Sequence, residues 1–202
     1  MQQIYTYLAL GDSYTIGEAV PLTNNFPNLL VQRLRKKGLP VAAPEIIAQT
    51  GWTTDELDSA IKGREYLSKY DMVTLLIGVN NQYRGREALQ YKMEFEELLK
   101  KAIEFANGKP SHVCVVSIPD YGVTPFALSM DAEKIGREID IFNNINKAVS
   151  IQYKTHYVDI TPGSREVLSD EELVTTDKLH PSGKEYLKWA EKLENWVTTL
   201  LK

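Results

Sequence analysis

Residues 4–15 read IYTYLALGDSYT, an apolar run that ends in a cluster of small and polar residues. The run from Ile4 to Leu10 is nearly continuous rather than alternating, which is typical of a strand covered on both faces. Gly, Asp, Ser and Thr are also the residues that turns prefer. Ser13 therefore has two interpretations, a turn or helix-cap residue and a nucleophile at the end of a buried strand.

Four further apolar runs follow along the chain, and several are equally continuous. They are the segments 41–48, 72–77, 113–118 and 157–160. Parallel sheets are buried on both faces and give such runs, so the pattern favours a parallel sheet.

Segments with helical spacing lie between these runs. The first begins at Asn25 and ends at Gly38, and the segments 87–107 and 131–154 are long enough to cross a sheet. Two more begin with the spacing of a capping box, Thr53 with Glu56 and Ser182 with Glu185. The last helix has a Trp and Leu stripe at steps of four, three and four, which indicates core packing. Alternating strands and helices predict an α/β fold, a three-layer α/β/α sandwich with right-handed crossovers.

Composition limits the classes of partner. The 202 residues suit one domain, 1–202, and the net charge of -4 argues against nucleic acid. No apolar stretch reaches the ~20 residues that a membrane span needs, so we expect no stable membrane insertion. The residues after Met1 show no signal peptide, and we expect a cytoplasmic protein. Cys114, the single cysteine, lies in an apolar run and is interpreted as a buried spectator.

Polar residues follow each predicted strand, where parallel sheets place their functional groups. These are Gly11-Asp12-Ser13, Gln49-Thr50-Gly51, Gly78-Val79-Asn80-Asn81, Pro119-Asp120 and, after the fifth strand, a longer segment that contains Asp177 and His180. The arrangement predicts that these groups meet at one edge of the sheet.

The three histidines separate by their position relative to the strands. His112 and His156 come directly before strands and belong to the opposite edge from Ser13. His180 is left as the base for Ser13, and Asp177, three residues earlier, can accept a hydrogen bond from its imidazole. Asp120, at the end of the fourth strand, is a rival for that role.

Three groups could stabilise a developing oxyanion at the same edge: the backbone N–H of Gly51, the side-chain amide of Asn80 and the backbone N–H of Ser13. Gly51 as a plain turn residue and Asn80 as a loop residue that bonds nearby backbone are equally good interpretations. Asp12 should point away from a site that Ser13 faces, because neighbouring residues of extended chain point to opposite sides. We interpret Asp12 as structural.

These motifs together give the sequence a resemblance to the SGNH, or GDSL-type, hydrolases. Gly11-Asp12-Ser13, Gly51, Gly78-x-Asn80 and Asp177-x-x-His180 occur in the family's order, from residue 8 to about 183. The resemblance implies a flavodoxin-like five-stranded parallel sheet and ester hydrolysis without a metal or an organic cofactor. It also implies Ser13 as nucleophile, His180 as base, Asp177 as its orienting partner, and Ser13, Gly51 and Asn80 as the oxyanion hole.

Two positions depart from the family's usual pattern. Tyr14 stands where the first motif commonly has Leu, and Asn81 stands where an Asp frequently follows the oxyanion Asn. Neither departure removes a catalytic group. Asn81 is expected to change loop support and local charge rather than the type of reaction.

The expected substrate is a small-molecule carboxylic ester, with a lysophospholipase or esterase type of activity. Removal of O-acetyl groups from carbohydrates is an alternative. Candidate substrate contacts are Tyr83 and Arg84, which follow the Asn80 motif, and Tyr121 and Phe126 in an apolar loop that could line an acyl pocket.

A function of a different class also fits the predicted fold. A flavodoxin-like module could bind phosphate or flavin through Ser13, Thr15 and Gly17 after the first strand. That interpretation leaves Asn80, Asp177 and His180 without a role. An α/β-hydrolase is disfavoured because no G-x-S-x-G pentapeptide occurs in the sequence.

Overall fold

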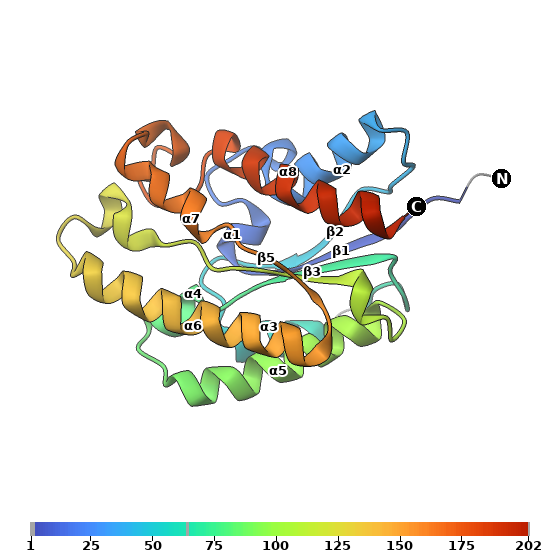
Figure 1. The fold of residues 1–202 in the computed structure, drawn as a ribbon, viewed down its shortest axis with the longest axis horizontal. Helices are drawn as coiled ribbons and strands as arrows, with labels where there is room; N and C mark the ends of the chain where they lie inside the picture. The colour runs from blue at the N-terminus through green and yellow to red at the C-terminus, as the bar shows by residue number, and fades with distance from the viewer. Residues whose placement is uncertain (1–2, 64, 202) are drawn as a thin grey trace.

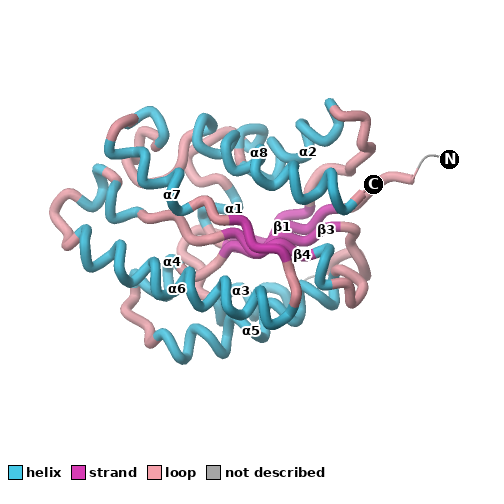
Figure 2. Tube along the Cα trace, in the orientation of Figure 1, coloured by secondary structure: helices cyan, strands magenta, loops and turns pink. Residues whose placement is uncertain are grey.

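The computed structural model of the chain describes residues 3–63 and 65–201. Its strands form a five-stranded, all-parallel sheet in the order β2-β1-β3-β4-β5. The strands are β1 Tyr7–Gly11, β2 Glu45–Ala48, β3 Met72–Leu76, β4 Val113–Val116 and β5 His156–Val158. The predicted fold class is confirmed, since helices cover both faces of this sheet (Figures 1 and 2).

The strands are shorter than the apolar runs that predicted them. The apolar run that starts at Val41 forms only an isolated bridge there, between Val41 and Tyr5. The strand β2 itself begins at Glu45. Pro44 directly precedes that start and has no N–H to donate to a ladder, which explains the late beginning. His156 is the first residue of β5 rather than the residue before it.

Eight α-helices connect and flank the strands within the described residues. They are α1 Ser13–Ile16, α2 Phe26–Lys36, α3 Thr54–Lys62, α4 Val79–Tyr83, α5 Ala88–Phe105, α6 Ala132–Tyr153, α7 Thr161–Ser164 and α8 Gly183–Leu200. Short 3-10 turns occupy Leu22–Asn24, Pro110–His112, Tyr121–Val123, Pro125–Ala127, Arg165–Leu168 and Glu171–Leu173. Helices α2 and α8 lie on one face of the sheet, and α3, α5 and α6 lie on the other (Figure 1). The sequence did not predict the short helices α1, α4 and α7.

The predicted helix starts are present, but one of the two capping boxes is not formed. The N–H of Thr53 donates to the Glu56 carboxylate at 2.9 Å, as predicted. The Ser182 hydroxyl instead donates to the carbonyl of Glu172 at 2.6 Å. Glu185 accepts a hydrogen bond from the Trp189 indole at 2.8 Å, and the start of α8 has no side-chain cap.

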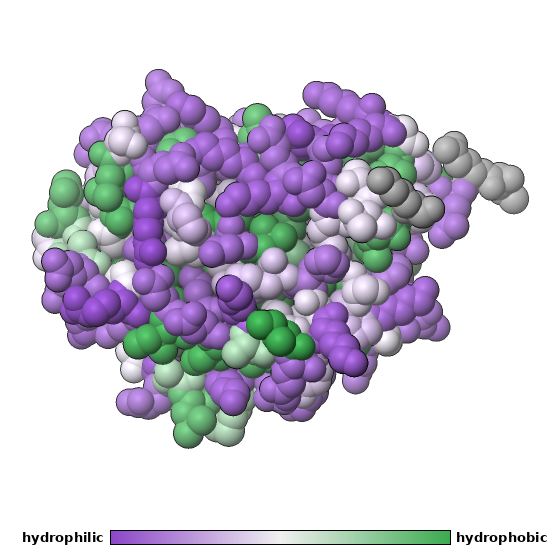
Figure 3. Space-filling view, viewed as in Figure 1, coloured by the Kyte–Doolittle hydropathy of each residue, from purple (hydrophilic) through white to green (hydrophobic). Residues whose placement is uncertain are grey.

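The core continues from the sheet into an aromatic cluster between α2 and α8. Phe26, Tyr186 and Trp189 are fully or almost fully buried, and their ring centroids lie 5.0–6.4 Å apart. Hydrophilic residues predominate on the face drawn in Figure 3, with apolar residues gathered along its lower edge. Among the described residues, no helix has both the length and the apolar character that a membrane crossing needs.

Gly78, between β3 and α4, has a backbone conformation and surroundings that only glycine fits. Its φ is +129°, and a Cβ there would lie 2.5 Å from the Tyr91 hydroxyl and 2.8 Å from Cδ1 of Ile118. The Tyr91 hydroxyl is itself held by hydrogen bonds to the Ile77 carbonyl and to Asn146. The start of α4 is therefore packed directly on the core.

We expect Gly78→Ala to destabilise the fold more than Gly38→Ala. Gly38 also has a positive φ, +81°, but a Cβ there would meet nothing within 4 Å. Both variants carry backbone strain, while only Gly78→Ala adds overpacking, which costs about 1–3 kcal/mol. Urea unfolding should show this difference in the free energy of unfolding, and equal values for the two variants would contradict the steric argument.

Candidate active site

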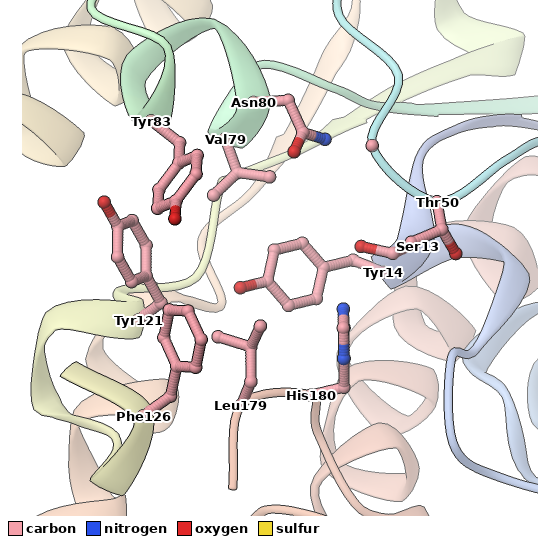
Figure 4. Close-up of a pocket in the computed structure, with 11 residues that line it drawn as sticks. Ser13, Tyr14, Thr50, Val79, Asn80, Tyr83, Tyr121, Phe126, Leu179 and His180 are labelled. Carbon is pink, nitrogen blue, oxygen red and sulfur yellow. The ribbon is translucent and has the colours of Figure 1, made fainter. Parts of the chain in front are cut away.

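A cavity of about 200 Å³ opens at the carboxyl edge of the sheet. Its wall consists of Ser13, Tyr14, Thr50, Gly51, Val79, Asn80, Tyr83, Tyr121, Phe126, Leu179 and His180 (Figure 4). These residues come from the segments that follow β1, β2, β3, β4 and β5. The segments that the sequence predicted to meet do meet here.

Ser13 is the first residue of α1 and follows β1 with one residue between them. Its hydroxyl faces the cavity, with Asn80 on one side and His180 on the other (Figure 4). Ser13 is only 5% exposed. No described group accepts its backbone N–H, which is expected for the first residue of a helix. Both the hydroxyl and this N–H are available to a ligand.

Asp12 lies beneath the Ser13 turn and not in the cavity. It is fully buried, and its Oδ1 accepts the N–H of Tyr14 at 3.0 Å, which caps α1. Burial raises the pKa of Asp12 to about 7, against the lowering effect of backbone hydrogen bonds from Tyr14 and from its own N–H. This position agrees with the structural role expected for it.

His180 and Asp177 form a close pair in the loop before α8. Nδ1 of His180 lies 2.7 Å from Oδ2 of Asp177. The other carboxylate oxygen accepts the hydroxyl of Thr175 at 2.6 Å and the N–H groups of Leu179 and His180 at 2.9 Å. Lys178 has a left-handed φ of 63°, and this turn folds the loop back on itself.

The charge of Asp177 fixes the tautomer of the His180 ring. Burial acts to raise the pKa of Asp177, but the hydrogen bonds from Thr175, His180 and Leu179 outweigh it and lower the pKa to about 2. An ionised carboxylate can only accept, so Nδ1 carries a proton and Nε2 is free to accept one. One ring nitrogen of His180 points toward Ser13 (Figure 4).

The alternative partners for the Ser13 site lie elsewhere. His112 contacts the carbonyl of Asp71 at 2.7 Å, and the ring of His156 packs 5.9 Å from that of Trp196. Both histidines are at the amino ends of β4 and β5. Asp120, the rival to Asp177, is bound by Arg165 at 2.9 Å and by the N–H of Gly122, so it is not the partner of His180.

Gly51 is held in a turn that leaves its N–H without a described acceptor. Its φ is +86°, a left-handed conformation that favours glycine. The Arg84 guanidinium donates to the Gly51 carbonyl at 2.6 Å and to Glu56 at 3.2 Å. These contacts fix the Gly51 turn from outside the cavity.

Asn80 and Asn81 have different roles in the structure. The Asn80 amide donates one hydrogen bond to the Trp52 carbonyl at 2.9 Å, and an amide nitrogen has a second N–H to offer. Asn81 is fully buried, and its amide accepts from the N–H of Thr54 and donates to the Thr54 hydroxyl. Asn81 thus joins α4 to α3, the loop support expected of it.

The predicted substrate contacts differ in their position relative to the cavity. Arg84 is not among its wall residues, and its guanidinium donates to Gly51 and Glu56. Tyr83, Tyr121 and Phe126 do line it. Four further wall residues were not predicted from the sequence, although each is the neighbour of a predicted site residue. They are Tyr14, Thr50, Val79 and Leu179.

Comparison with known proteins agrees with this arrangement. A profile of the GDSL-like lipase/acylhydrolase family matches residues 9–186. The chain belongs to this family. Among curated proteins, no significant match is found. Among the described residues of this GDSL-family chain, no group of three or more His, Cys, Asp or Glu could hold a metal ion.

Solved structures have the same fold at low sequence identity. TesA is 21% identical with a TM-score of 0.76, over 96% of this chain and 99% of that chain. A lipase/acylhydrolase from Enterococcus faecalis is 15% identical with a TM-score of 0.76, over 96% of both chains. Axe2, an acetylxylan esterase from Geobacillus stearothermophilus, is 17% identical with a TM-score of 0.75, over 96% and 94%.

We expect Arg84→Met to lower kcat while KM changes little. The substitution removes the donors that hold the Gly51 carbonyl, so the Gly51 N–H should lose its fixed direction without any loss of cavity wall. Steady-state kinetics on an aryl ester would measure both constants, with a thermal melt to show that the fold is retained. Arg137→Met, on the exposed side of α6, is the matched control. A change confined to KM would mean that Arg84 contacts substrate after all.

Proposed function

We propose that this GDSL-family protein is a serine hydrolase that cleaves carboxylic esters through an acyl-enzyme at Ser13. The observation that carries the proposal is the hydrogen-bonded pair of Asp177 and His180, 2.7 Å apart, at a cavity that Ser13 also lines. A nucleophile, a base and a group that orients the base are the parts that acyl transfer needs. They come from two segments that are distant in the sequence.

The first half of the reaction forms the acyl-enzyme. Nε2 of His180 takes the proton of the Ser13 hydroxyl as its oxygen attacks the ester carbonyl carbon. Asp177, ionised because its pKa is about 2, stabilises the imidazolium that results. The imidazolium then gives the proton to the alkoxide of the leaving alcohol as the ester C–O bond breaks. Water, deprotonated by the same ring, attacks the acyl-enzyme in the second half and releases the acid.

The negative charge on the carbonyl oxygen needs donors that are already in place. The N–H groups of Ser13 and Gly51 have no acceptor among the described residues, and Asn80 has a second amide N–H. All three residues line the cavity, which supports their proposed role as the oxyanion hole. Donors fixed before the reaction stabilise the transition state without reorganising.

The cavity supports a small, uncharged ester as the substrate. At about 200 Å³ it is below the range of about 300–1,000 Å³ that is common for drug-sized ligands. Among the residues that the structure describes, no Lys, Arg, Asp or Glu lines it. A lysophospholipid would need a partner for its phosphate, and Arg84 is already engaged by Gly51 and Glu56. We therefore favour simple carboxylic esters over lysophospholipids.

An acetylated carbohydrate is a second candidate substrate. Tyr83 lines the cavity and is 55% exposed, and its ring meets that of Tyr121 edge to face at 6.0 Å. An exposed aromatic face beside the reaction centre is a surface on which a sugar ring can pack. The likeness of the fold to Axe2, which is an acetylxylan esterase, is consistent with this candidate.

The phosphate- or flavin-binding alternative is disfavoured by the hydrogen bonds after β1. The N–H groups of Tyr14, Thr15, Ile16 and Gly17 are all used within the turn, by Asp12 or Ser13. The Asp12 carboxylate lies beneath the same turn. A phosphate group would meet few free donors there.

We expect a fluorophosphonate probe to label the protein at Ser13. The probe reacts with serines that a neighbouring base activates, so Ser13→Ala should abolish both the labelling and the hydrolysis of aryl acetates. Ser59→Ala, on the exposed side of α3, should keep both. Intact-mass and peptide mass spectrometry would locate the label. An active enzyme that is labelled elsewhere, or not at all, would overturn the proposal.

We expect Asn80→Ala to lower kcat by roughly 10²–10³-fold, the loss that follows removal of one oxyanion donor. The effect should appear in kcat rather than in KM, because the donor acts on the charge that develops in the transition state. Asn144→Ala, exposed on α6, is the control and should behave as wild type. Unchanged turnover in Asn80→Ala would remove Asn80 from the oxyanion hole.

A further inference from the structure

Tyr14, which replaces the common Leu of the first motif, lies across the candidate active-site cavity. It is the second residue of α1, and its ring extends from beside Ser13 toward Tyr121, Phe126 and Leu179 (Figure 4). The residue is 3% exposed. Within the described part of the chain, no group forms a hydrogen bond with its hydroxyl.

A second, smaller cavity lies directly behind this ring. Its volume is about 20 Å³, and three of its wall residues, Tyr14, Tyr121 and Leu179, also line the first cavity. The remaining wall consists of the apolar residues Pro119, Val167, Leu173, Val174 and Pro181 and of the polar residues Thr124, Ser164 and Glu185. The three shared side chains therefore form a partition between the active-site cavity and an apolar space.

The ring of Tyr14 is fixed in this partition. Its centroid lies 5.6 Å from the His180 ring and 6.4 Å from the Trp189 ring, both in edge-to-face geometry. The backbone N–H of Tyr14 is bound by Asp12. Since Trp189 belongs to the buried aromatic cluster, the ring cannot swing aside without disturbing the core. Because the Tyr14 ring is held in place, it limits the length of the active-site cavity.

The mechanism of ester cleavage determines whether the acyl half or the alcohol half of the substrate lies against the Tyr14 ring. The leaving alcohol has to stay beside Nε2 of His180 to receive its proton, and the carbonyl oxygen has to face Gly51 and Asn80. The acyl chain is the remaining substituent. The apolar end of the active-site cavity, in front of the Tyr14 ring, is left to receive it.

We propose that Tyr14 determines the acyl chain length that this enzyme accepts, by closing the apolar end of the cavity. The inference rests on the proposed esterase function. Wild-type enzyme should prefer short acyl groups such as acetyl and butanoyl. A smaller side chain at position 14 should join the two cavities and admit longer chains.

The test is a series of p-nitrophenyl esters from acetate to decanoate, with wild type and Tyr14→Leu. Each methylene that a pocket cannot accept costs roughly tenfold or more in kcat/KM. We expect the octanoate to butanoate ratio of kcat/KM to rise at least about tenfold in Tyr14→Leu on the same grounds. Tyr153→Leu is the matched control, because Tyr153 lines neither cavity, and its ratio should stay near that of wild type.

Further variants distinguish the effect of the Tyr14 ring from the effect of its hydroxyl and from a loss of folding. Tyr14→Phe keeps the ring and should keep the wild-type ratio. Adding Val167→Phe to Tyr14→Leu refills the second cavity and should restore the preference for short chains. Leu179→Ala opens the partition from its other side and should raise the ratio even if Tyr14→Leu does not fold. Circular dichroism would confirm the fold of each variant.

The results that would overturn the role of Tyr14 differ from those that would overturn the proposed esterase function. Ratios unchanged from wild type in folded Tyr14→Leu and Leu179→Ala, with Ser13 still labelled by fluorophosphonate, would overturn the role of Tyr14 alone. A parallel series of acetate esters with different alcohols is needed as well. If Tyr14→Leu alters only the alcohol preference, the ring faces the leaving group and the proposal is wrong. Loss of both labelling and hydrolysis in the wild type would overturn the esterase function itself.

Discussion

The site depends on the pairing of β1 with β2 along one edge and with β3 along the other. Gly11, the last residue of β1, is level with Ala48 of β2 and with Leu76 of β3. The three strands therefore end on one line, and the turns that follow them start side by side. A shift of one residue in either ladder would move Gly51 or Asn80 away from Ser13 and turn alternate side chains to the other face.

The contacts that fix these turns lie outside the cavity. Arg84 holds the Gly51 carbonyl, and the Asn80 amide bonds the carbonyl of Trp52 on the same turn. The Asp177 loop is held by the N–H groups of Leu179 and His180, which donate to the Asp177 carboxylate. None of these contacts uses the backbone N–H of Ser13 or of Gly51.

Sequence reasoning predicted the sheet, the long helices and the edge at which the polar groups meet, because strand burial and helix caps leave a local pattern. It did not predict the orientation of Arg84 or the position of the Tyr14 ring. Both depend on contacts between segments far apart in the chain, Arg84 with Gly51 and Tyr14 with Trp189. The sequence favoured Asp177 over Asp120 as the partner of His180 because Asp177 shares its loop, and the folded chain adds that Asp120 is bound by Arg165.

Charge is arranged around the cavity rather than in it. The ionised carboxylate of Asp177 lies behind His180, and the described residues of the wall include no Lys, Arg, Asp or Glu. An apolar wall with few charges lowers the local dielectric, which strengthens the effect of the Asp177 carboxylate on an imidazolium and of each fixed N–H on an oxyanion. The same wall gives little binding energy to a charged substrate. The features that support the proposed ester hydrolysis at Ser13 are therefore the same ones that support our proposal of a neutral, compact ester as substrate.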